Sequence, residues 1–291
     1  MSIIVKVRNI NLTREPMPLK VVLGPDMLYG VYDEGWRLHS GNRNPYDFVA
    51  YMPKQIARGI CINWHEEECD CVTFKVLLPT SAAEIREFFL AVHRTCEYWG
   101  GQLEVDGRPR ELEEFIDDYE AIQKFNEHTL KEMAKSIING ENSELTLFSV
   151  MWPLVMGKDE AEAFIFQPSY FSRWLHEKQN VDAYFSKPAF YRSEDGILGR
   201  YAISEQLRSI IPIKPYVPYG FDDPETGELI KCDDFGMLIY SMKDNNTMGE
   251  LKYSDFIQKI KTNHAKKIKK YDGNHLILEE LSAEELEALL D

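Results

Sequence analysis

The chain lacks the common sequence signatures of nucleotide and cofactor binding. It contains no glycine-rich dinucleotide fingerprint and no serine nucleophile elbow. Gly157-Lys158 is followed by Asp159, so there is no phosphate loop either. The pairs His65-Glu66 and His176-Glu177 both lack the second histidine that a zinc protease helix carries one turn later. We therefore predict no cofactor, and a non-catalytic protein is favoured over an enzyme.

Long hydrophobic runs are also missing. No stretch approaches the roughly 18 apolar residues of a membrane-spanning helix, and charges interrupt the N-terminal run, Met1 to Ile10, too early for a secretory signal. Cysteine is scarce: five residues in a chain of 291, an odd number that suits reduced thiols better than a disulfide framework. These absences predict a cytoplasmic protein that does not contact a membrane.

Positive charge is in short supply. The chain has 33 lysines and arginines against 48 aspartates and glutamates, which gives a formal net charge of -15 at pH 7. A field of this sign repels nucleic-acid phosphates and anionic lipids. We therefore expect no nucleic-acid binding, and any large partner is predicted to be a basic protein.

The most informative segment runs from Ile60 to Gly101. Apolar residues alternate with polar ones over residues 60–64 and 72–78, which predicts a half-buried β-hairpin. Ser81 and Glu84 then form a capping box just after Pro79. Apolar residues recur at helical spacing from there to residue 99, and Gly100-Gly101 supplies a left-handed stop.

Similar patterns predict an α+β fold of antiparallel-rich mixed sheets with packed helices. We expect a β-rich N-terminal subdomain with one capped helix, residues 1–107, followed by a helical segment and an α+β subdomain, residues 108–291; a single domain is the alternative. Strands are predicted at 3–8, 19–23, 47–51, 60–64, 72–78, 103–105, 145–152, 183–192, 197–204, 209–213, 235–242 and 275–278. Helices are predicted at 81–99, 110–138, 159–166, 169–178, 254–270 and 282–290. The second of these is predicted to break near Asn126, whose side chain can cap a helix that starts at Glu127.

Reactive side chains concentrate on the predicted hairpin. If its loop has three residues, His65 lies opposite Cys69 and Asn63 opposite Cys71, with Cys61 on the same face. Zinc prefers four such nitrogen and sulfur ligands in a tetrahedral array. The spacing matches no established zinc motif, and the glutamates beside it equally describe a solvated turn. The metal candidates are therefore Cys61, His65, Cys69 and Cys71, and a surface hairpin with free thiols is the favoured alternative.

Carboxylates crowd the start of the second helical block, between residues 111 and 120. Acidic fields steer association with basic surfaces, so this block is the best candidate for contact with a basic partner. The predicted partner-binding residues are Glu111, Glu113, Glu114, Asp117 and Asp118.

Three other groups of residues have simpler explanations. The carboxylates at 221–228 and 232–234 lack a calcium-loop pattern and suit a polar connection between strands. The lysines between Lys252 and Lys270 fit a solvated helix face better than a nucleic-acid contact, given the total charge. The aromatic residues between 152 and 191 suit a second core, although some of them could line a groove.

Four segments together resemble a bacterial family of unknown function: Ala57–Trp64, Leu78–Ser81, Phe148–Lys158 and Tyr184–Tyr191. The resemblance runs along most of the chain and implies a bacterial, cytoplasmic, acidic protein, but it brings no activity and no catalytic residue. The leading hypothesis is therefore a non-catalytic binding or regulatory protein that acts through its acidic surface. The alternative is an enzyme or metal-binding protein whose site is assembled from scattered carboxylates or from the thiol hairpin.

Overall fold

The computed structural model describes the whole chain except residues 11–16, 34–36, 43–46, 65–69, 194–195 and 223–226. The described residues form two compact units, Met1–Val181 and Asp182–Asp291. The fold is α+β with mostly antiparallel sheets, as predicted. The sequence-based boundary after residue 107 falls inside the first unit, between two paired strands. No helix in the described ranges is both long and apolar enough to cross a bilayer.

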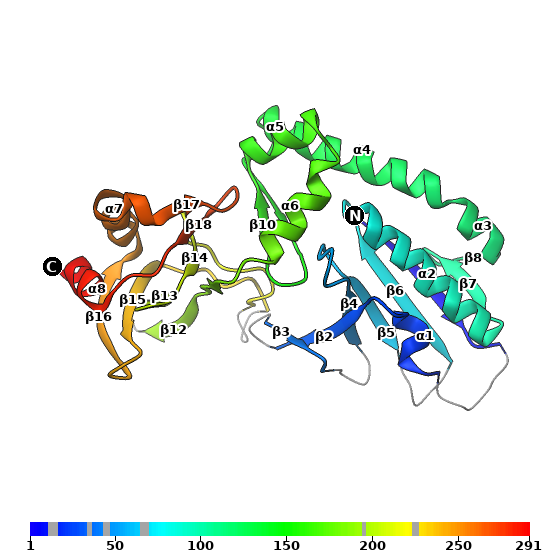
Figure 1. Cartoon of the computed structure of the whole chain (residues 1–291), viewed down its shortest axis with the longest axis horizontal. Helices are drawn as coiled ribbons and strands as arrows, with labels where there is room; N and C mark the ends of the chain where they lie inside the picture. The colour runs from blue at the N-terminus through cyan, green and yellow to red at the C-terminus, as the bar shows by residue number, and fades with distance from the viewer. Residues whose placement is uncertain (11–16, 34–36, 43–46, 65–69, 194–195, 223–226) are drawn as a thin grey trace. The chain divides into compact units, whose positions relative to one another are not determined.

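One sheet of eight described strands, here called the large sheet, organises the first unit (Figure 1). Its order is β3-β2-β4-β5-β6-β1-β7-β8, and all of its strand pairs are antiparallel. The N-terminal strand therefore lies between β6 and β7, and β8 with its central Pro109 forms one edge. The strands are β1 (Ser2–Arg8), β2 (Leu28–Tyr32), β3 (Leu38–Ser40), β4 (Asp47–Tyr51), β5 (Ile60–Trp64), β6 (Cys71–Leu77), β7 (Gln102–Val105) and β8 (Arg108–Arg110).

Helix α2 (Ala82–Trp99) packs against one face of this sheet (Figure 1). The predicted helix start is confirmed, because the Ser81 hydroxyl accepts a hydrogen bond from the Glu84 N–H at 3.1 Å. The stop is confirmed too, because Gly100 has a left-handed backbone with φ of 57°. Val5, Phe74 and Phe88 are fully buried in the core between helix and sheet.

The prediction of a strand over residues 19–23 is wrong, because this segment forms the short helix α1 (Leu19–Leu23). Its β-branched composition suggested a strand, but a tertiary contact decides the outcome. Arg94 on α2 donates to the carbonyls of Val21 and Val22, both at 2.9 Å. These bonds satisfy carbonyls at the end of a helix that is too short to be stable alone.

The long helical block is interrupted eight residues earlier than predicted. It consists of α3 (Leu112–Asp117) and α4 (Tyr119–Ile138), which meet at Asp118. Asn126 was expected to cap a helix start, but it lies buried inside α4. Its side chain bonds to Thr80, so a distant partner replaces the local capping role.

The remainder of the first unit comprises a small hairpin and two helices. The prediction of one strand over 145–152 is wrong: β9 (Leu145–Leu147) pairs with β10 (Leu154–Met156), and residues between them turn. The Gln179 amide fixes that turn by accepting from the Met151 N–H at 2.6 Å and donating to the Trp152 carbonyl at 3.0 Å. The two helices are α5 (Lys158–Phe166) and α6 (Tyr170–Gln179).

The second unit contains two four-stranded sheets among its described residues, in the orders β11-β14-β18-β17 and β12-β13-β15-β16. The predicted hairpin is present as β12 and β13, with Ser193 opposite Gly196, and its turn residues lie outside the described part. The strands are β11 (Tyr184–Phe185), β12 (Ala189–Ser193), β13 (Gly196–Ser204), β14 (Ser209–Pro212), β15 (Asp234–Ser241), β16 (Asn246–Lys252), β17 (Ile268–Lys270) and β18 (His275–Leu278).

Two helices complete the second unit. The prediction of one helix over 254–270 is wrong, because α7 (Tyr253–Asn263) gives way to a short 3₁₀ turn, η1 (Ala265–Lys267), and then to β17. The C-terminal helix α8 (Ala283–Leu290) is confirmed together with its capping box. Buried apolar residues of both helices pack with β13 and β15 in one core.

Candidate functional site

The register of the β5–β6 hairpin differs from the one predicted for the thiol cluster. Asn63 lies opposite Thr73 rather than opposite Cys71. Cys71 instead lies opposite Arg8 of β1 on its other side. The shift is two residues, and strand side chains alternate with a period of two, so Cys61 and Cys71 keep the face that was predicted for them.

The metal prediction is left with two described candidates, Cys61 and Cys71; His65 and Cys69 lie outside the described residues. No group of three or more potential metal ligands occurs in the part of the chain that the structure describes. Cys61 is exposed at the surface, but the protein atoms around its thiol displace water and so raise its pKa, while Lys75 acts in the opposite direction. Burial also raises the pKa of the Cys71 thiol. Both thiols are therefore mainly protonated at neutral pH, unlike activated nucleophiles.

Cys61 belongs to a surface that we call the open face: the side of β1, β4, β5 and β6 opposite α2. Cross-strand pairing arranges its side chains in rows. Two rows cross these strands: Ile4, Lys75, Cys61 and Val49 form the first, and Lys6, Thr73, Asn63 and Asp47 form the second. The first row is apolar at both ends, and the second is polar throughout.

A pocket of about 430 Å³ opens on this face. Residues of both rows line it, together with Tyr32 and Val31 of β2. Within it the Asn63 amide donates to the Asp47 carboxylate at 2.7 Å. Lys75 is exposed and has no ion pair among the described residues. Apart from this pair, the pocket presents an ammonium group, a hydroxyl and a thiol.

A buried polar network lies close to the same strands. Glu84, at the start of α2, is 2% exposed and accepts three hydrogen bonds. The N–H groups of Arg58 and Gly59 donate to its two oxygens at 3.2 and 2.6 Å, and the Thr80 hydroxyl donates at 2.5 Å. Burial raises the pKa of Glu84, whereas the Thr80 hydrogen bond acts against that rise.

The Arg58 side chain extends this network to more distant segments. Its Nε donates to the Phe148 carbonyl at 2.7 Å, and its Nη1 donates to the Pro79 carbonyl at 3.2 Å. Burial lowers the pKa of Arg58 to about 10, so the guanidinium stays charged at neutral pH. Three of the segments that carry the family resemblance, 57–64, 78–81 and 148–158, therefore meet at one arginine.

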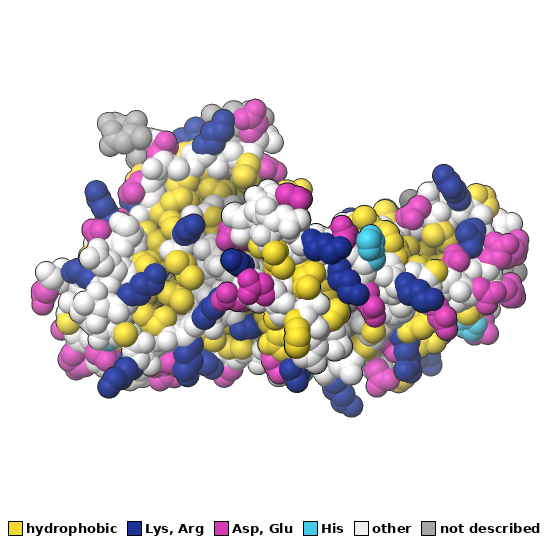
Figure 2. Space-filling model, turned by 90° about the horizontal axis from the view of Figure 1, so that it is seen from above, with side chains coloured by type: hydrophobic (Ala, Val, Ile, Leu, Met, Phe, Trp, Pro, Cys, Tyr) yellow, Lys and Arg dark blue, Asp and Glu magenta, His cyan; other side chains and the backbone are white. Residues whose placement is uncertain are grey.

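The predicted acidic residues face solvent on and beside α3. We call Glu111, Glu113, Glu114, Asp117 and Asp118 the α3 acidic surface; the first four are exposed and the last is half-buried. Figure 2 shows acidic side chains gathered at its right-hand end, where α3 lies in Figure 1.

Phe115 fixes the orientation of this surface. Its ring is 1% exposed and stacks on Phe89 of α2, with ring centroids 4.3 Å apart. Because successive helix residues are rotated by about 100°, burying Phe115 turns Glu113 and Asp117 outward. Ile116 lies beside them and is 40% exposed.

Arg110 neutralises part of the α3 acidic surface. Its guanidinium lies 3.2 Å from the Glu114 carboxylate and 2.8 Å from the Asp118 carboxylate. Glu111, Glu113 and Asp117 have no ion pair among the described residues. These three carboxylates, with Ile116, are the part of the surface that a partner can reach unopposed.

Comparison with known proteins identifies the family. A family model, Domain of unknown function (DUF4299), matches residues 2–289. The chain belongs to this family. No curated protein and no solved structure matches the chain.

A second polar network in this DUF4299 protein was not predicted from the sequence. His275 and Asp272 are both fully buried, and the imidazole Nδ1 lies 2.8 Å from Asp272 Oδ1. The other ring nitrogen lies 3.2 Å from the Tyr216 hydroxyl. A neutral imidazole satisfies both partners by donating to Asp272 and accepting from Tyr216. The three-residue spacing of Asp272 and His275 across a turn could have predicted their contact. The contact with Tyr216 could not be predicted in this way, because Tyr216 is far away in the sequence.

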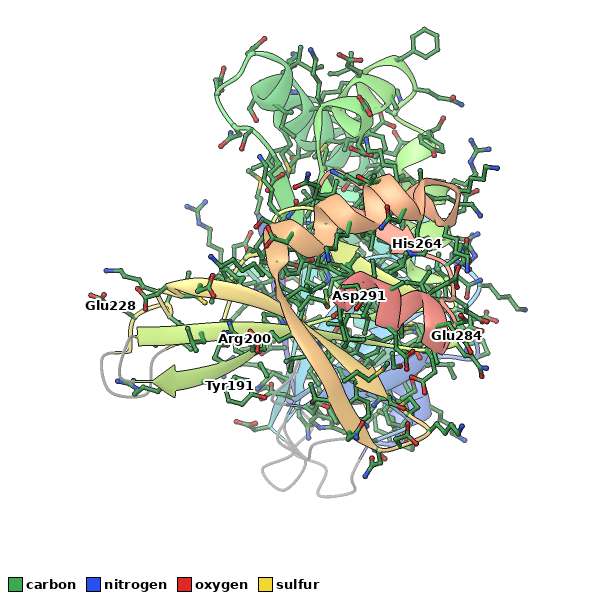
Figure 3. All side chains as sticks on the ribbon, turned by 90° about the vertical axis from the view of Figure 1, so that its left-hand side faces the viewer. Tyr191, Arg200, Glu228, His264, Glu284 and Asp291 are labelled. Atoms are coloured by element: carbon green, nitrogen blue, oxygen red, sulfur yellow. The ribbon has the colours of Figure 1, made fainter. Side chains whose placement is uncertain are left out.

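The lysine group predicted on one helix face is divided among β16, α7, η1 and β17. Lys267 pairs with Glu285 at 2.6 Å, and Lys269 pairs with Glu279 at 2.8 Å. Figure 3 shows His264 and Glu284 where these elements approach α8. These two lysines thus pair with carboxylates on α8 and just after β18, and Lys259 of α7 donates to the Leu289 carbonyl at 2.7 Å. On α7 the interpretation as a solvated face is left with the exposed Lys261.

The described carboxylates of the loop that was predicted to be a polar connection between strands make contacts within the second unit. Residues 223–226 lie outside the described part. Asp233 accepts from the Ile197 N–H at 2.8 Å, and Asp234 lies 3.9 Å from Arg200. Arg200, shown in Figure 3, pairs more closely with Glu250 at 2.6 Å. The aromatic residues Phe164, Phe171 and Trp174 pack on one another as core, as expected.

Proposed function

We propose that this protein is a non-catalytic binding or regulatory protein of the bacterial cytoplasm, which recognises a basic protein through the α3 acidic surface. The observation that carries the proposal is the outward-facing set of Glu113, Ile116 and Asp117, held by the buried Phe115. An apolar side chain ringed by charges is the usual anatomy of a protein interface.

The charge of the whole chain supports the same partner. A formal net charge of -15 creates a long-range field that speeds association with basic surfaces and slows association with acidic ones. The local carboxylates would then orient the partner, and Ile116 would enter an apolar recess on it. We therefore expect the partner to present lysines or arginines around a small apolar depression.

The alternative function is an enzyme or a metal-binding protein whose site is assembled from scattered carboxylates or from the hairpin of His65, Cys69 and Cys71. His65 and Cys69 lie outside the described part of the chain, and no group of three or more potential metal ligands occurs among the described residues. No described observation therefore favours this alternative over the binding role.

A charge-reversal experiment tests the proposal. The double variant Glu113→Lys/Asp117→Lys removes two of the three unpaired carboxylates and leaves the Arg110 ion pairs in place. The control, Glu141→Lys/Glu144→Lys, makes the same charge change at two exposed residues of the first unit that take part in no ion pair among the described residues. Each form would be used, at low and at high salt, to capture partners from cells that make the wild-type protein.

A basic protein that binds the wild type and the control, but not the α3 variant, supports the proposal. Such a partner should dissociate at high salt, because exposed charges are screened there. It should also bind Ile116→Ser at least about tenfold more weakly, as expected for a central apolar contact worth about 1.4 kcal/mol or more. Recovery of the same proteins by all forms, or of none that is basic, would overturn it.

A further inference from the structure

The pocket on the open face is large enough to hold a small ligand. Its volume of about 430 Å³ falls within the range of about 300–1,000 Å³ that small-molecule sites occupy. Strands β1, β2, β4, β5 and β6 all contribute to its lining, so its walls belong to one rigid sheet. Sites built on strands hold their side chains more firmly than sites built on loops.

The chemistry of the pocket changes from one side to the other. Thr73 and Lys75 lie two residues apart on the same face of β6, and they place a hydroxyl beside an ammonium group. Cys61 lies next to Lys75 across the strands, and Val49 follows it on β4. A ligand that lies across the strands would thus meet a polar end at β6 and an apolar surface towards β4.

The charge of the available groups selects the ligand. The Asp47 carboxylate accepts from the Asn63 amide and keeps its charge, but it lies on β4, whereas Lys75 lies on β6 with β5 between them. Lys75 and the Thr73 hydroxyl have no bonded partner among the described residues, so the β6 side of the pocket carries the positive charge. An anionic group would therefore find an ammonium and a hydroxyl donor, while a cationic ligand would meet Lys75 as a repelling charge. Lysine binds carboxylates as a point charge and needs no fixed geometry.

We propose that this pocket binds a small carboxylate with an apolar body, with the carboxylate at Lys75 and Thr73 and the body over Cys61 towards Val49. The site lies away from the α3 acidic surface and does not depend on the proposed protein partner. Cys61 lies under the ligand in this arrangement, so its thiol reports occupancy directly.

Protection of Cys61 from iodoacetamide tests the proposal in the full-length protein. Hexanoate is the probe, and hexylamine is the control of equal length and opposite charge. Peptide mass spectrometry follows alkylation of Cys61, with Cys232 in the second unit as the internal standard. The variants are Lys75→Met, which removes the charge at similar volume, and Lys75→Arg, which keeps it.

We expect hexanoate to slow the alkylation of Cys61 severalfold and saturably in the wild type and in Lys75→Arg, without changing Cys232. Hexylamine should give no protection, and Lys75→Met should lose it. Because Lys75 is exposed, we expect this variant to fold, and an unreactive Cys96, which is buried in the core of the same unit, would verify that. Lack of protection in the wild type, equal protection by hexylamine, or full protection in a folded Lys75→Met protein would each overturn the proposal.

Discussion

Asn126 holds both main-chain groups of Thr80. The Thr80 N–H donates to Asn126 Oδ1 at 2.8 Å, and Asn126 Nδ2 donates to the Thr80 carbonyl at 3.0 Å. The side-chain amide thus makes the two hydrogen bonds to Thr80 that the main chain of a paired β-strand would make. With its backbone held in this way, Thr80 is positioned to donate its hydroxyl to Glu84.

Asn126→Ala should lower the free energy of unfolding by about 2–4 kcal/mol. The substitution leaves a buried donor and a buried acceptor of Thr80 without a partner, and each such loss costs about 1–3 kcal/mol. Asn139→Ala at the exposed end of α4 is the control and should change stability by less than about 0.5 kcal/mol. Urea unfolding of both variants measures the difference, and equal midpoints with equal slopes would contradict the prediction.

Gly59→Ala should lower the free energy of unfolding by about 2–4 kcal/mol, because the backbone strain of a positive φ and the steric clash of an added Cβ combine there. The residue has φ of 81°, and an added Cβ would lie 2.5 Å from the Val49 side chain and 2.9 Å from that of Val150. Gly41 has a similar φ of 79° with nothing within 4 Å of an added Cβ. Gly41→Ala should therefore show only the backbone cost, about 1–2 kcal/mol.

The difference between these two variants in thermal or urea unfolding isolates the steric cost. If Gly59→Ala were no less stable than Gly41→Ala, the close contact of Gly59 with Val49 and Val150 would be incorrect.

The contribution of Glu84 to the free energy of unfolding should decrease as the pH rises, which is the opposite of the usual behaviour of a carboxylate. Burial raises its pKa in the folded state, so the folded chain binds this proton more tightly than the unfolded chain. The resulting stability is present below the ordinary carboxylate pKa and is lost as the pH rises through the raised value. Relative to Glu84→Gln, the wild type should therefore lose free energy of unfolding as the pH increases from acidic to neutral.

Glu285 provides the opposite case. A hydrogen bond from Lys267 lowers its pKa, so its contribution is present above the ordinary carboxylate pKa and is lost as the pH falls. Relative to Glu285→Gln, the wild type should lose stability on acidification. Urea unfolding of the three proteins over a pH series measures both slopes, and slopes of the same sign would contradict the two assignments.

Cys96 should resist alkylation in the folded protein while Cys61 reacts. Cys96 is 3% exposed, and burial raises its pKa to about 12, whereas Cys61 is exposed on the open face. Timed reaction with iodoacetamide followed by peptide mass spectrometry should show modification of Cys96 only under unfolding conditions. Similar rates for the two thiols in native buffer would contradict the burial of Cys96.

The elements that could be predicted are those whose signals are local. The Ser81 capping box, the apolar spacing of α2 and Gly100 all lie within twenty residues, and they located that helix correctly. The capping box of Ser282 located α8 in the same way. The exposure of the α3 acidic surface could be predicted because its five carboxylates lie within eight residues of sequence, and no distant residue had to be identified.

The errors arose where a distant residue decides the local structure. Residues 19–23 are helical where Arg94 binds their carbonyls. Asn126 bonds to the main chain of Thr80 instead of capping a helix. The network of Arg58 and Glu84 joins segments that are 26 residues apart, and no sequence pattern predicts that these segments meet. The register of β5 and β6 depended on an assumed loop length, which hydrophobic alternation cannot supply.

Pro109, at the centre of the last strand of the large sheet, also affects how copies of the protein meet. Proline offers no N–H to an incoming strand, and it stands between Arg108 and Arg110, whose charges repel a second copy of the same edge. The opposite edge, β3, is only three residues long. Neither border of the sheet is therefore a good template for fibril growth, and the protein should tolerate high concentration without polymerising through this sheet.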